Sequence, residues 1–534
     1  MRFRSSTLLC ALLLLLTAQF TGAAPFVAEK SMEAPGVPFD RAEHFARMTA
    51  LQASLDRAAV AIAWSTPLEI RVSPERLRGV RHQATEAQKM RVGVVTELAI
   101  PMTFTRSAIS PRQPILHDTL GAVRGAYGGG FEWTGVIRSP EAAAVRIGFS
   151  DFELPEGSEL FVFTSDGMAF GPYSGRGPNG TGEFWTNSVA GEEIVLELRA
   201  GAGGAPRFTI SGIGHLTDDF AIARSLAPLP EATAGSPNCS FNASCVVGAS
   251  CPGTNAAAIS TAVNAVAHIL FASGGWLYIC SGGLVADSDT STNIPYFMTA
   301  NHCISRDSEA SSLETFFFYT AACGQCPDPG AHSTVGSSIV STNSRTSDYT
   351  LLRLSGSAPA GASFLGWSSQ DITSTTNALY RISHPQGAPQ SYSEQVVDPT
   401  KGVCRSWPRG KWIYSKDVFG ATEGGSSGSP VVNAAGQLVG QLSGACGTNV
   451  NDVCDSAKNA TVDGAFAAYY SLVAPYLGAG GGGGGCTDND GDGYCTSEGD
   501  CNDNNAAIYP GANDTKGKPG HDGVDNDCDG IIDG

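Results

Sequence analysis

The segment Gly424-Gly425-Ser426-Ser427-Gly428-Ser429-Pro430 contains the pattern Gly-x-Ser-Gly-x-Pro, in which Ser427 is the serine. Glycines on both sides let the backbone turn tightly, so that the Ser427 hydroxyl projects from the chain. They also let the N–H groups of Gly425 and Ser427 converge beside that hydroxyl as an oxyanion hole. One such donor lowers a reaction barrier by about 3 kcal/mol. The segment therefore predicts a nucleophilic serine, which requires a His and an Asp elsewhere in the chain.

A histidine and an aspartate precede this serine in suitable contexts. His302 is the second-last residue of the apolar segment 296–303, and Asp348 is the second residue of the segment 347–354. A lone His is more often structural, and an Asp before a strand is usually a turn residue. Ser426 is the alternative nucleophile, but the pattern fits only Ser427. The order His302, Asp348, Ser427 is that of chymotrypsin and differs from those of subtilisins and α/β-hydrolases, so together the three motifs predict a catalytic triad.

The N-terminus has the features of an export signal. Basic residues precede the apolar run 8–16, and Thr21-Gly22-Ala23 forms a small-residue cleavage site, so residues 1–23 are predicted to be a signal peptide. No apolar segment is long enough to cross a bilayer as a helix. Of the 15 cysteines only Cys10 lies in the signal, which leaves an even number for disulfides in an oxidising compartment. The protein is predicted to be secreted, with cell-surface association as a further option.

Length and charge limit the remaining possibilities. The chain has 534 residues, of which 42% are hydrophobic and 16% are charged, so it can form several packed domains. The formal net charge of −18 disfavours nucleic acid as a partner, because nucleic acid is a polyanion. Protein or peptide substrates are the expected partners.

The region 24–235 carries no catalytic constellation. Residues 39–62 have helical spacing, and from Phe131 onward short alternating segments separated by turns predict a small antiparallel β-sandwich. The predicted strands are 144–149, 159–164, 182–185, 193–198 and 207–213. Residues 226–238, rich in proline and small residues, are predicted to be a linker.

Residues 239–478 resemble chymotrypsin-fold serine endopeptidases, and most of all the bacterial lysyl endopeptidase group. The resemblance rests on 277–285, 299–303, 348–354, 424–430 and 440–442, and on the opening Cys245, Cys251 and Pro252. It implies a mostly β fold, with a domain at 236–478 in which two packed antiparallel β-barrels hold the triad between them. It also implies that His302 is the general base, that Asp348 orients it, and that Ser427 attacks the substrate and forms an acyl-enzyme.

The same resemblance implies a set of disulfides. It pairs Cys280 with Cys303 beside the catalytic histidine, Cys245 with Cys446, and Cys251 with either Cys323 or Cys326. Two further bridges would join Cys239, Cys404, Cys454 and the unused member of that pair. A zinc site at Cys323 and Cys326 is the alternative, but no second ligand pair is evident, and export favours disulfides.

Substrate preference is where the resemblance weakens. A trypsin-like pocket has an Asp six residues before the nucleophile, and Ala421 occupies that position here. The acid that lysyl endopeptidases use late in the domain has no counterpart in register, and Ser443 replaces a histidine near their pocket. The residues expected to bind substrate are Leu442, Ser443 and Gly444, and the candidate pocket acids are Asp452, Asp455 and Asp463. Preference for Lys, Arg or small apolar residues stays open.

The region 24–235 resembles, through 182–185 and 193–198, the pro-regions of such proteases, so the protein is predicted to be a zymogen. A permanently retained binding domain is the alternative. No lysine lies between Lys89 and Lys401, so a strictly lysine-specific enzyme could not cut near residue 235. Self-cleavage would best occur after Arg224. The other option is cleavage within 226–238, by the enzyme itself or by another protease.

After the glycine linker 479–485, residues 486–534 contain two Asp-x-Asp-x-Asp-Gly runs. Alternating carboxylates around a glycine turn suit a hard cation such as Ca²⁺, although the Glu that completes an EF-hand loop is missing. The segment resembles the short metal-binding repeat of bacterial secreted proteins, and the alternative is an acidic solubilising tail. The predicted ligands are Asp488, Asp490, Asp492, Asp500, Asp503, Asp525, Asp527, Asp529 and Asp533. The predicted disulfides join Cys486 to Cys495 and Cys501 to Cys528 and stabilise a module that has almost no core.

Together these features predict a secreted serine endopeptidase that needs no cofactor for catalysis. Its C-terminal module would be stabilised by Ca²⁺ and could contact a surface or matrix partner. The alternative is a secreted or surface adhesin built on an inactive protease fold.

Overall fold

The structure is a computed structural model. It describes residues 29–34, 38–58, 66–81, 89–104, 114–126, 129–165, 167–218, 226, 242–289, 292–325, 331–345, 347–404 and 407–478, with five single residues between 502 and 508. The predicted signal peptide, the glycine linker and Arg224 lie outside the described residues. So do nearly all of the C-terminal module and all of its predicted metal ligands and cysteines.

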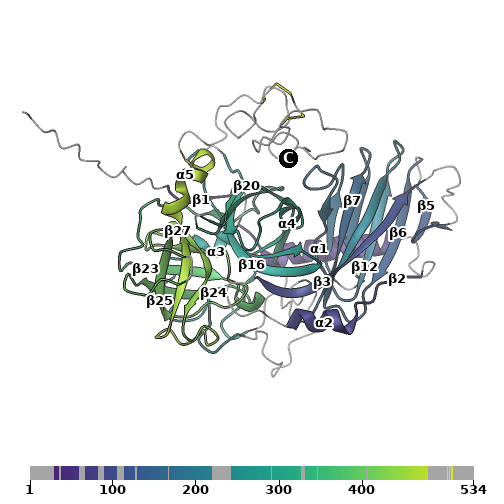
Figure 1. Cartoon of the computed structure of the whole chain (residues 1–534). Helices are drawn as coiled ribbons and strands as arrows, with labels where there is room; N and C mark the ends of the chain where they lie inside the picture. The colour runs from purple at the N-terminus through teal and green to yellow at the C-terminus, as the bar shows by residue number, and fades with distance from the viewer. Residues whose placement is uncertain are drawn as a thin grey trace, which may run out of the picture.

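A β-sandwich forms the N-terminal region, as predicted (Figure 1). One sheet contains β4 (Ile115–Leu116), β5 (Ala122–Gly125), β6 (Phe131–Arg138), β12 (Glu193–Ala200), β8 (Glu159–Phe163) and β9 (Ala169–Tyr173), with β2 (Leu68–Glu69) beside β6. The other contains β10 (Phe184–Trp185), β11 (Val189–Ala190), β7 (Ala144–Glu153), β13 (Arg207–Leu216) and β3 (Met90–Thr103). Trp133, Ile147 and Phe208 belong to the core between them. The predicted helix is α1 (Arg41–Ala58), and α2 (Pro74–Arg81) precedes β3.

The first barrel is a curled sheet of antiparallel strands. Strand pairing runs in the order β19 (His332–Val335), β18 (Glu314–Phe317), β15 (Val266–Ser273), β16 (Trp276–Leu284), β17 (Tyr296–Ala300), β21 (Tyr349–Leu354) and β20 (Ser337–Asn343), and the chain connection from β19 to β20 joins the two ends. Gly336, with φ +86°, turns the chain from β19 into β20. The short helix α3 (Ala262–Ala265) precedes β15, and α4 (Asp307–Ser311) lies between β17 and β18 in the sequence.

In the second barrel strand pairing closes the ring completely. Its order is β24 (Ser391–Val397), β23 (Ala378–Ser383), β26 (Pro430–Val432), β27 (Leu438–Gly447), β28 (Asn459–Ala465) and β25 (Trp412–Phe419), which returns to β24. β14 (Val247–Gly248) pairs with β24, and β1 (Met32–Glu33) pairs with β22 (Ser363–Phe364). A C-terminal helix, α5 (Phe466–Leu477), follows β28, and its Tyr469 stacks on Tyr349 of the first barrel with ring centroids 4.1 Å apart. The expected double β-barrel fold is confirmed.

The strand β3 joins the N-terminal region to the first barrel. Along most of its length it pairs with β13, and its first residues pair with β16. Figure 1 shows β3 and β16 running between the sandwich and the barrels. A buried charge pair adds to this junction, because Arg146 of β7 lies 3.9 Å from Glu314 of β18 and both side chains are fully buried. The N–H and hydroxyl of Ser188 also donate to Glu314, so the two regions share one sheet and a buried polar cluster.

Candidate active site

Strand pairing brings His302 and Asp348 together. β17 ends two residues before His302, and β21 begins directly after Asp348; Ala300 of β17 pairs with Tyr349 of β21. Asp348 Oδ2 lies 2.7 Å from His302 Nδ1, and Asp348 Oδ1 accepts a hydrogen bond of 2.8 Å from the His302 backbone N–H. Asp348 has φ +54°, a conformation that Asp tolerates better than most residues. The carboxylate thus orients the ring so that Nδ1 carries the proton and Nε2 can accept one.

The Ser427 loop is held against the first barrel by Ser281 of β16. The Ser281 N–H donates to Ser427 O at 2.8 Å, and its hydroxyl donates to Gly425 O at 2.9 Å. Glycine is required at Gly428, because φ is +80° and an added Cβ would lie 2.2 Å from Thr299 Oγ1. The close approach of the two barrels therefore explains why small residues surround the serine.

The geometry favours Ser427 over Ser426 as the nucleophile. Ser426 is fully buried, whereas Ser427 retains 8% exposure. Within the described part of the chain, the N–H groups of Gly425 and Ser427 donate no hydrogen bond, so both are available to an oxyanion. No hydrogen bond joins Ser427 to His302 among the described residues, and catalytic hydrogen bonds are often long until substrate binds.

Four disulfides lie among the described residues. Cys280 is bonded to Cys303, and Cys251 is bonded to Cys323, one of its two expected partners. The expected pairing of Cys245 with Cys446 is wrong: Cys245 is bonded to Cys454, and Cys446 to Cys404. The reason is that Cys446, near the end of β27, packs in a cluster with Cys404, Trp407, Trp412 and Tyr414. Cys239 and Cys326 lie outside the described residues.

These disulfides also exclude two metal arrangements. Cys323 cannot serve the alternative zinc site as a thiolate, because its sulfur is bonded to Cys251. Cys280, His302 and Cys303 bring potential metal-ligand atoms within 4.8 Å of one another. Both of these sulfur atoms belong to one disulfide, however, and zinc requires thiolates. No resident metal is therefore assigned to this catalytic group.

The three candidate pocket acids already have partners. Asp463 is fully buried and pairs with Arg381 Nη2 at 2.6 Å. Asp455 pairs with Lys458 at 3.2 Å, and Asp452 accepts a hydrogen bond from the Cys454 N–H. Burial raises the pKa of Asp463, and the charge of Arg381 opposes that rise. An uncommitted acid for a basic substrate residue is therefore not found among these three.

The expected substrate-binding strand does lie beside the catalytic loop. Leu442 N donates to Ser429 O at 3.0 Å, and Gly428 N donates to Leu442 O at 2.8 Å. Ser443 is buried, and Gly444 follows it in β27. Their contacts with substrate remain a prediction.

Two carboxylates of the barrels were not predicted from the sequence. In β25, Asp417 Oδ1 accepts a hydrogen bond of 2.9 Å from Thr461, and burial raises the pKa of Asp417 to about 6. Glu309 of α4 accepts a hydrogen bond from the backbone N–H of Ser305, three residues beyond His302. Neither acid belongs to a short motif, and only the folded barrels reveal their surroundings.

Comparison with known proteins agrees with the motifs. Residues 238–459 match the family model of the lysyl endopeptidase C-terminal domain. Over these residues the chain is similar to the C-terminal domain of lysyl endopeptidases. A lysyl endopeptidase of Pseudomonas aeruginosa is 28% identical over 355 residues, which cover 63% of this chain and 72% of the relative. The secreted RxLR effector protein 73 of Plasmopara viticola is 26% identical over 342 residues, covering 60% and 79%. The protein is thus related to a family of peptidases.

Other comparisons concern the C-terminus and solved structures. Residues 500–534 match a metal-binding motif model whose name refers to copper. The HtrA-type protease AlgW with tripeptide aligns with a TM-score of 0.29 at 18% identity, over 41% of this chain and 63% of that one. The serine endoprotease from Yersinia pestis aligns with a TM-score of 0.31 at 16% identity, over 43% and 69%. None of the described helices has the length and apolar character needed to span a bilayer.

Proposed function

We infer that the chain is a secreted serine endopeptidase in which His302, Asp348 and Ser427 form the catalytic triad. The observation that carries this inference is the pair of hydrogen bonds that the Asp348 carboxylate accepts from the ring and the backbone N–H of His302. They leave His302 Nε2 as the proton acceptor. Among the described residues the N–H of Gly425, two residues before Ser427, donates no hydrogen bond and can therefore serve an oxyanion. The relationship of 238–459 to lysyl endopeptidases supports the same reaction.

The mechanism follows from these groups. His302 Nε2 takes the proton of Ser427 as its Oγ bonds to the substrate carbonyl carbon, and Gly425 and Ser427 N–H groups stabilise the oxyanion. The imidazolium, stabilised by Asp348, returns this proton to the amine, which leaves as the C–N bond breaks. Water, deprotonated by His302, then hydrolyses the acyl-enzyme and regenerates Ser427.

The remaining domains follow the precursor interpretation. Residues 1–23 direct export, and residues 24–235 act as a propeptide that is removed after Arg224 or within 226–238. Residues 486–534 bind a divalent cation through their aspartates, with Ca²⁺ as the ion that suits this ligand set. N-terminal sequencing of secreted wild type and Ser427→Ala locates the processing site and shows whether the enzyme cuts itself.

Labelling by a fluorophosphonate tests the catalytic assignment. The secreted wild type and Ser426→Ala are expected to gain the phosphonyl adduct, and peptide mapping is expected to place it on Ser427. Ser427→Ala is expected to remain unlabelled while keeping the melting temperature of the wild type. Absence of label on the folded wild type would favour the binding-protein alternative.

A further inference from the structure

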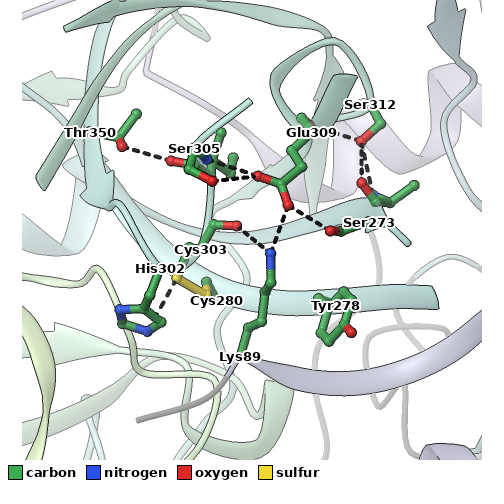
Figure 2. Close-up of polar contacts among 12 residues, drawn as sticks. Lys89, Ser273, Tyr278, Cys280, His302, Cys303, Ser305, Glu309, Ser312 and Thr350 are labelled. Atoms are coloured by element: carbon green, nitrogen blue, oxygen red, sulfur yellow. Dashed lines mark hydrogen bonds and ion pairs between the residues drawn. A yellow bond between two sulfur atoms is a disulfide. The ribbon is translucent and has the colours of Figure 1, made fainter. Parts of the chain in front are cut away.

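Lys89 places its ammonium group in a site built by the first barrel, as Figure 2 shows. Its Nζ lies 2.8 Å from Glu309 Oε1 and 3.1 Å from Cys303 O. The same nitrogen lies 5.0 Å from the ring centroids of both Phe271 and Tyr278. A carboxylate, a carbonyl oxygen and two aromatic faces all attract a positive charge. The site is therefore suited to a cationic side chain.

Glu309 is held in place without help from Lys89. Its side chain is only 4% exposed, and it accepts hydrogen bonds from Ser273 Oγ at 2.6 Å and from Ser305 N at 2.8 Å. Burial raises the pKa of Glu309, but the hydrogen bonds from Lys89, Ser273 and Ser305 outweigh this effect and lower it overall. A buried carboxylate without a cation is costly. If the N-terminal region leaves, the site is ready for another cation.

This cation site adjoins the catalytic residues. Cys303 follows His302 directly and is bonded to Cys280. Met90, the residue after Lys89, lies beside the Ser427 loop: a Cβ added at Gly424 of that loop would lie 3.8 Å from Met90 Cβ. The chain at residues 89 and 90 therefore contacts both the histidine side and the serine-loop side of the site.

The direction of β3 matches that of a leaving group. β16 runs from Trp276, which pairs with Val94, to Ile279, which pairs with Met90, and then to Ser281 beside the Ser427 loop. Since the pairing is antiparallel, the chain moves away from the catalytic site as it proceeds from residue 90 to residue 94. Residues that follow a scissile bond leave the site with the same polarity. The acyl side of a substrate is expected on β27 of the other barrel.

We propose that Glu309, the Cys303 carbonyl and the rings of Phe271 and Tyr278 form a subsite for Lys or Arg in the first residue of the leaving group. In the structure Lys89 occupies this subsite, so the N-terminal region blocks the exit side of the cleft. The inference rests on the proposed function and adds a substrate class to it: peptides with a basic residue directly after the cleaved bond.

Two pentapeptides test the subsite as competitive inhibitors of the secreted protein. One is Lys-Met-Arg-Val-Gly, the sequence of residues 89–93, and the other has norleucine in place of Lys. The assay is hydrolysis of p-nitrophenyl acetate, whose leaving group carries no cation. The lysine peptide is expected to bind about tenfold more tightly. Glu309→Gln should abolish this ratio, whereas Asp307→Asn, which removes an exposed charge from the same helix, should preserve it.

Failure of the inference and failure of the proposed function are distinguishable. No ester hydrolysis by folded wild type counts against the function. Normal ester hydrolysis with equal inhibition by the lysine and norleucine peptides overturns the subsite. This comparison uses only the wild type, so it tests the subsite even if Glu309→Gln does not fold. If the secreted protein retains residues 24–235, Lys89→Ala vacates the subsite. Its melting temperature should then rise with n-butylammonium but not with n-butanol, and an equal response to both would overturn the subsite.

Discussion

Glu309 in the first barrel and Asp463 in the second are both buried carboxylates paired with a cation, but the cations differ in origin. The partner of Glu309 is Lys89, 220 residues away in the N-terminal region. The partner of Asp463 is Arg381 of the same barrel, which also donates to Ser429 O. The charge of Asp463 is thus neutralised permanently. The charge of Glu309 becomes available to a substrate only when the N-terminal region withdraws.

The largest effect is expected from removing Arg381, the cation that pairs with Asp463 within the second barrel. Arg381→Met leaves Asp463 buried without its partner, which should lower the free energy of unfolding by about 3–5 kcal/mol. Urea denaturation of the secreted protein measures this loss. The double variant Arg381→Met/Asp463→Leu should recover most of the stability, because it removes both charges. A single variant as stable as the wild type would break the comparison.

Acid should destabilise the contact between α1 and the first barrel and stabilise the second barrel. His44 of α1 stacks on His332 of β19 with ring centroids 5.0 Å apart. Burial lowers the pKa of each to about 4; the charge of Arg47 adds to this for His44, and the charges of His44 and then Arg47 add to it for His332. Between pH 6.5 and 4 the undocked imidazoles bind more protons than the docked ones, so acidification weakens this contact by about 3 kcal/mol for each histidine. In the second barrel, the raised pKa of Asp417, about 6, adds stability as pH falls below 6.

Limited proteolysis at pH 7, 5.5 and 4.5 measures both effects. Cleavage within α1 is expected to accelerate at low pH while the second barrel stays resistant. The variant His44→Gln/His332→Gln should make cleavage within α1 less dependent on pH in this window. An equal rise in the cleavage rates of α1 and of the second barrel at low pH would contradict these opposite effects.

Removing the cation of the N-terminal region should have a smaller effect than removing Arg381. In Lys89→Met the aliphatic part of the side chain is kept, and Glu309 retains its bonds from Ser273 and Ser305, so we expect a loss of about 2 kcal/mol. Lys458→Met is the matched control, since the Lys458 side chain is 62% exposed in its pair with Asp455. A loss in Lys89→Met as large as that in Arg381→Met would show that Glu309 is not prepared for an exchange of cations.

The catalytic motifs could be found in the sequence because each is local. Gly425, Ser427 and Gly428 encode a turn, and His302 and Asp348 lie at the ends of apolar segments that form neighbouring strands. β3 was missed because most of its strand pairing is with distant segments and Pro101 lies inside it, which argues against a central strand. The Cys245–Cys446 pairing was predicted wrongly because the partner of Cys446 depends on the side of the barrel toward which the end of β27 points. There Cys446 packs with Cys404. The Lys89–Glu309 contact likewise exists only in the folded chain.

The smallest effect is expected at the C-terminus. A chain ending at residue 478 should hydrolyse p-nitrophenyl acetate as fast as the full chain, because the glycine linker makes the module mechanically independent. Ca²⁺ should order residues 486–534, as seen by circular dichroism after chelation. Ordering by Cu²⁺ alone would reassign the metal, and loss of hydrolysis on truncation would contradict the independence.

The central claim is that Ser427 is the nucleophile. The most direct test is to measure amide hydrolysis of one peptide substrate by Ser427→Ala, Ser426→Ala and the wild type. The account predicts that kcat falls by several orders of magnitude in Ser427→Ala, while Ser426→Ala, which alters a buried neighbour of the nucleophile, keeps measurable activity. Near-normal activity in Ser427→Ala together with its loss in Ser426→Ala would contradict the account.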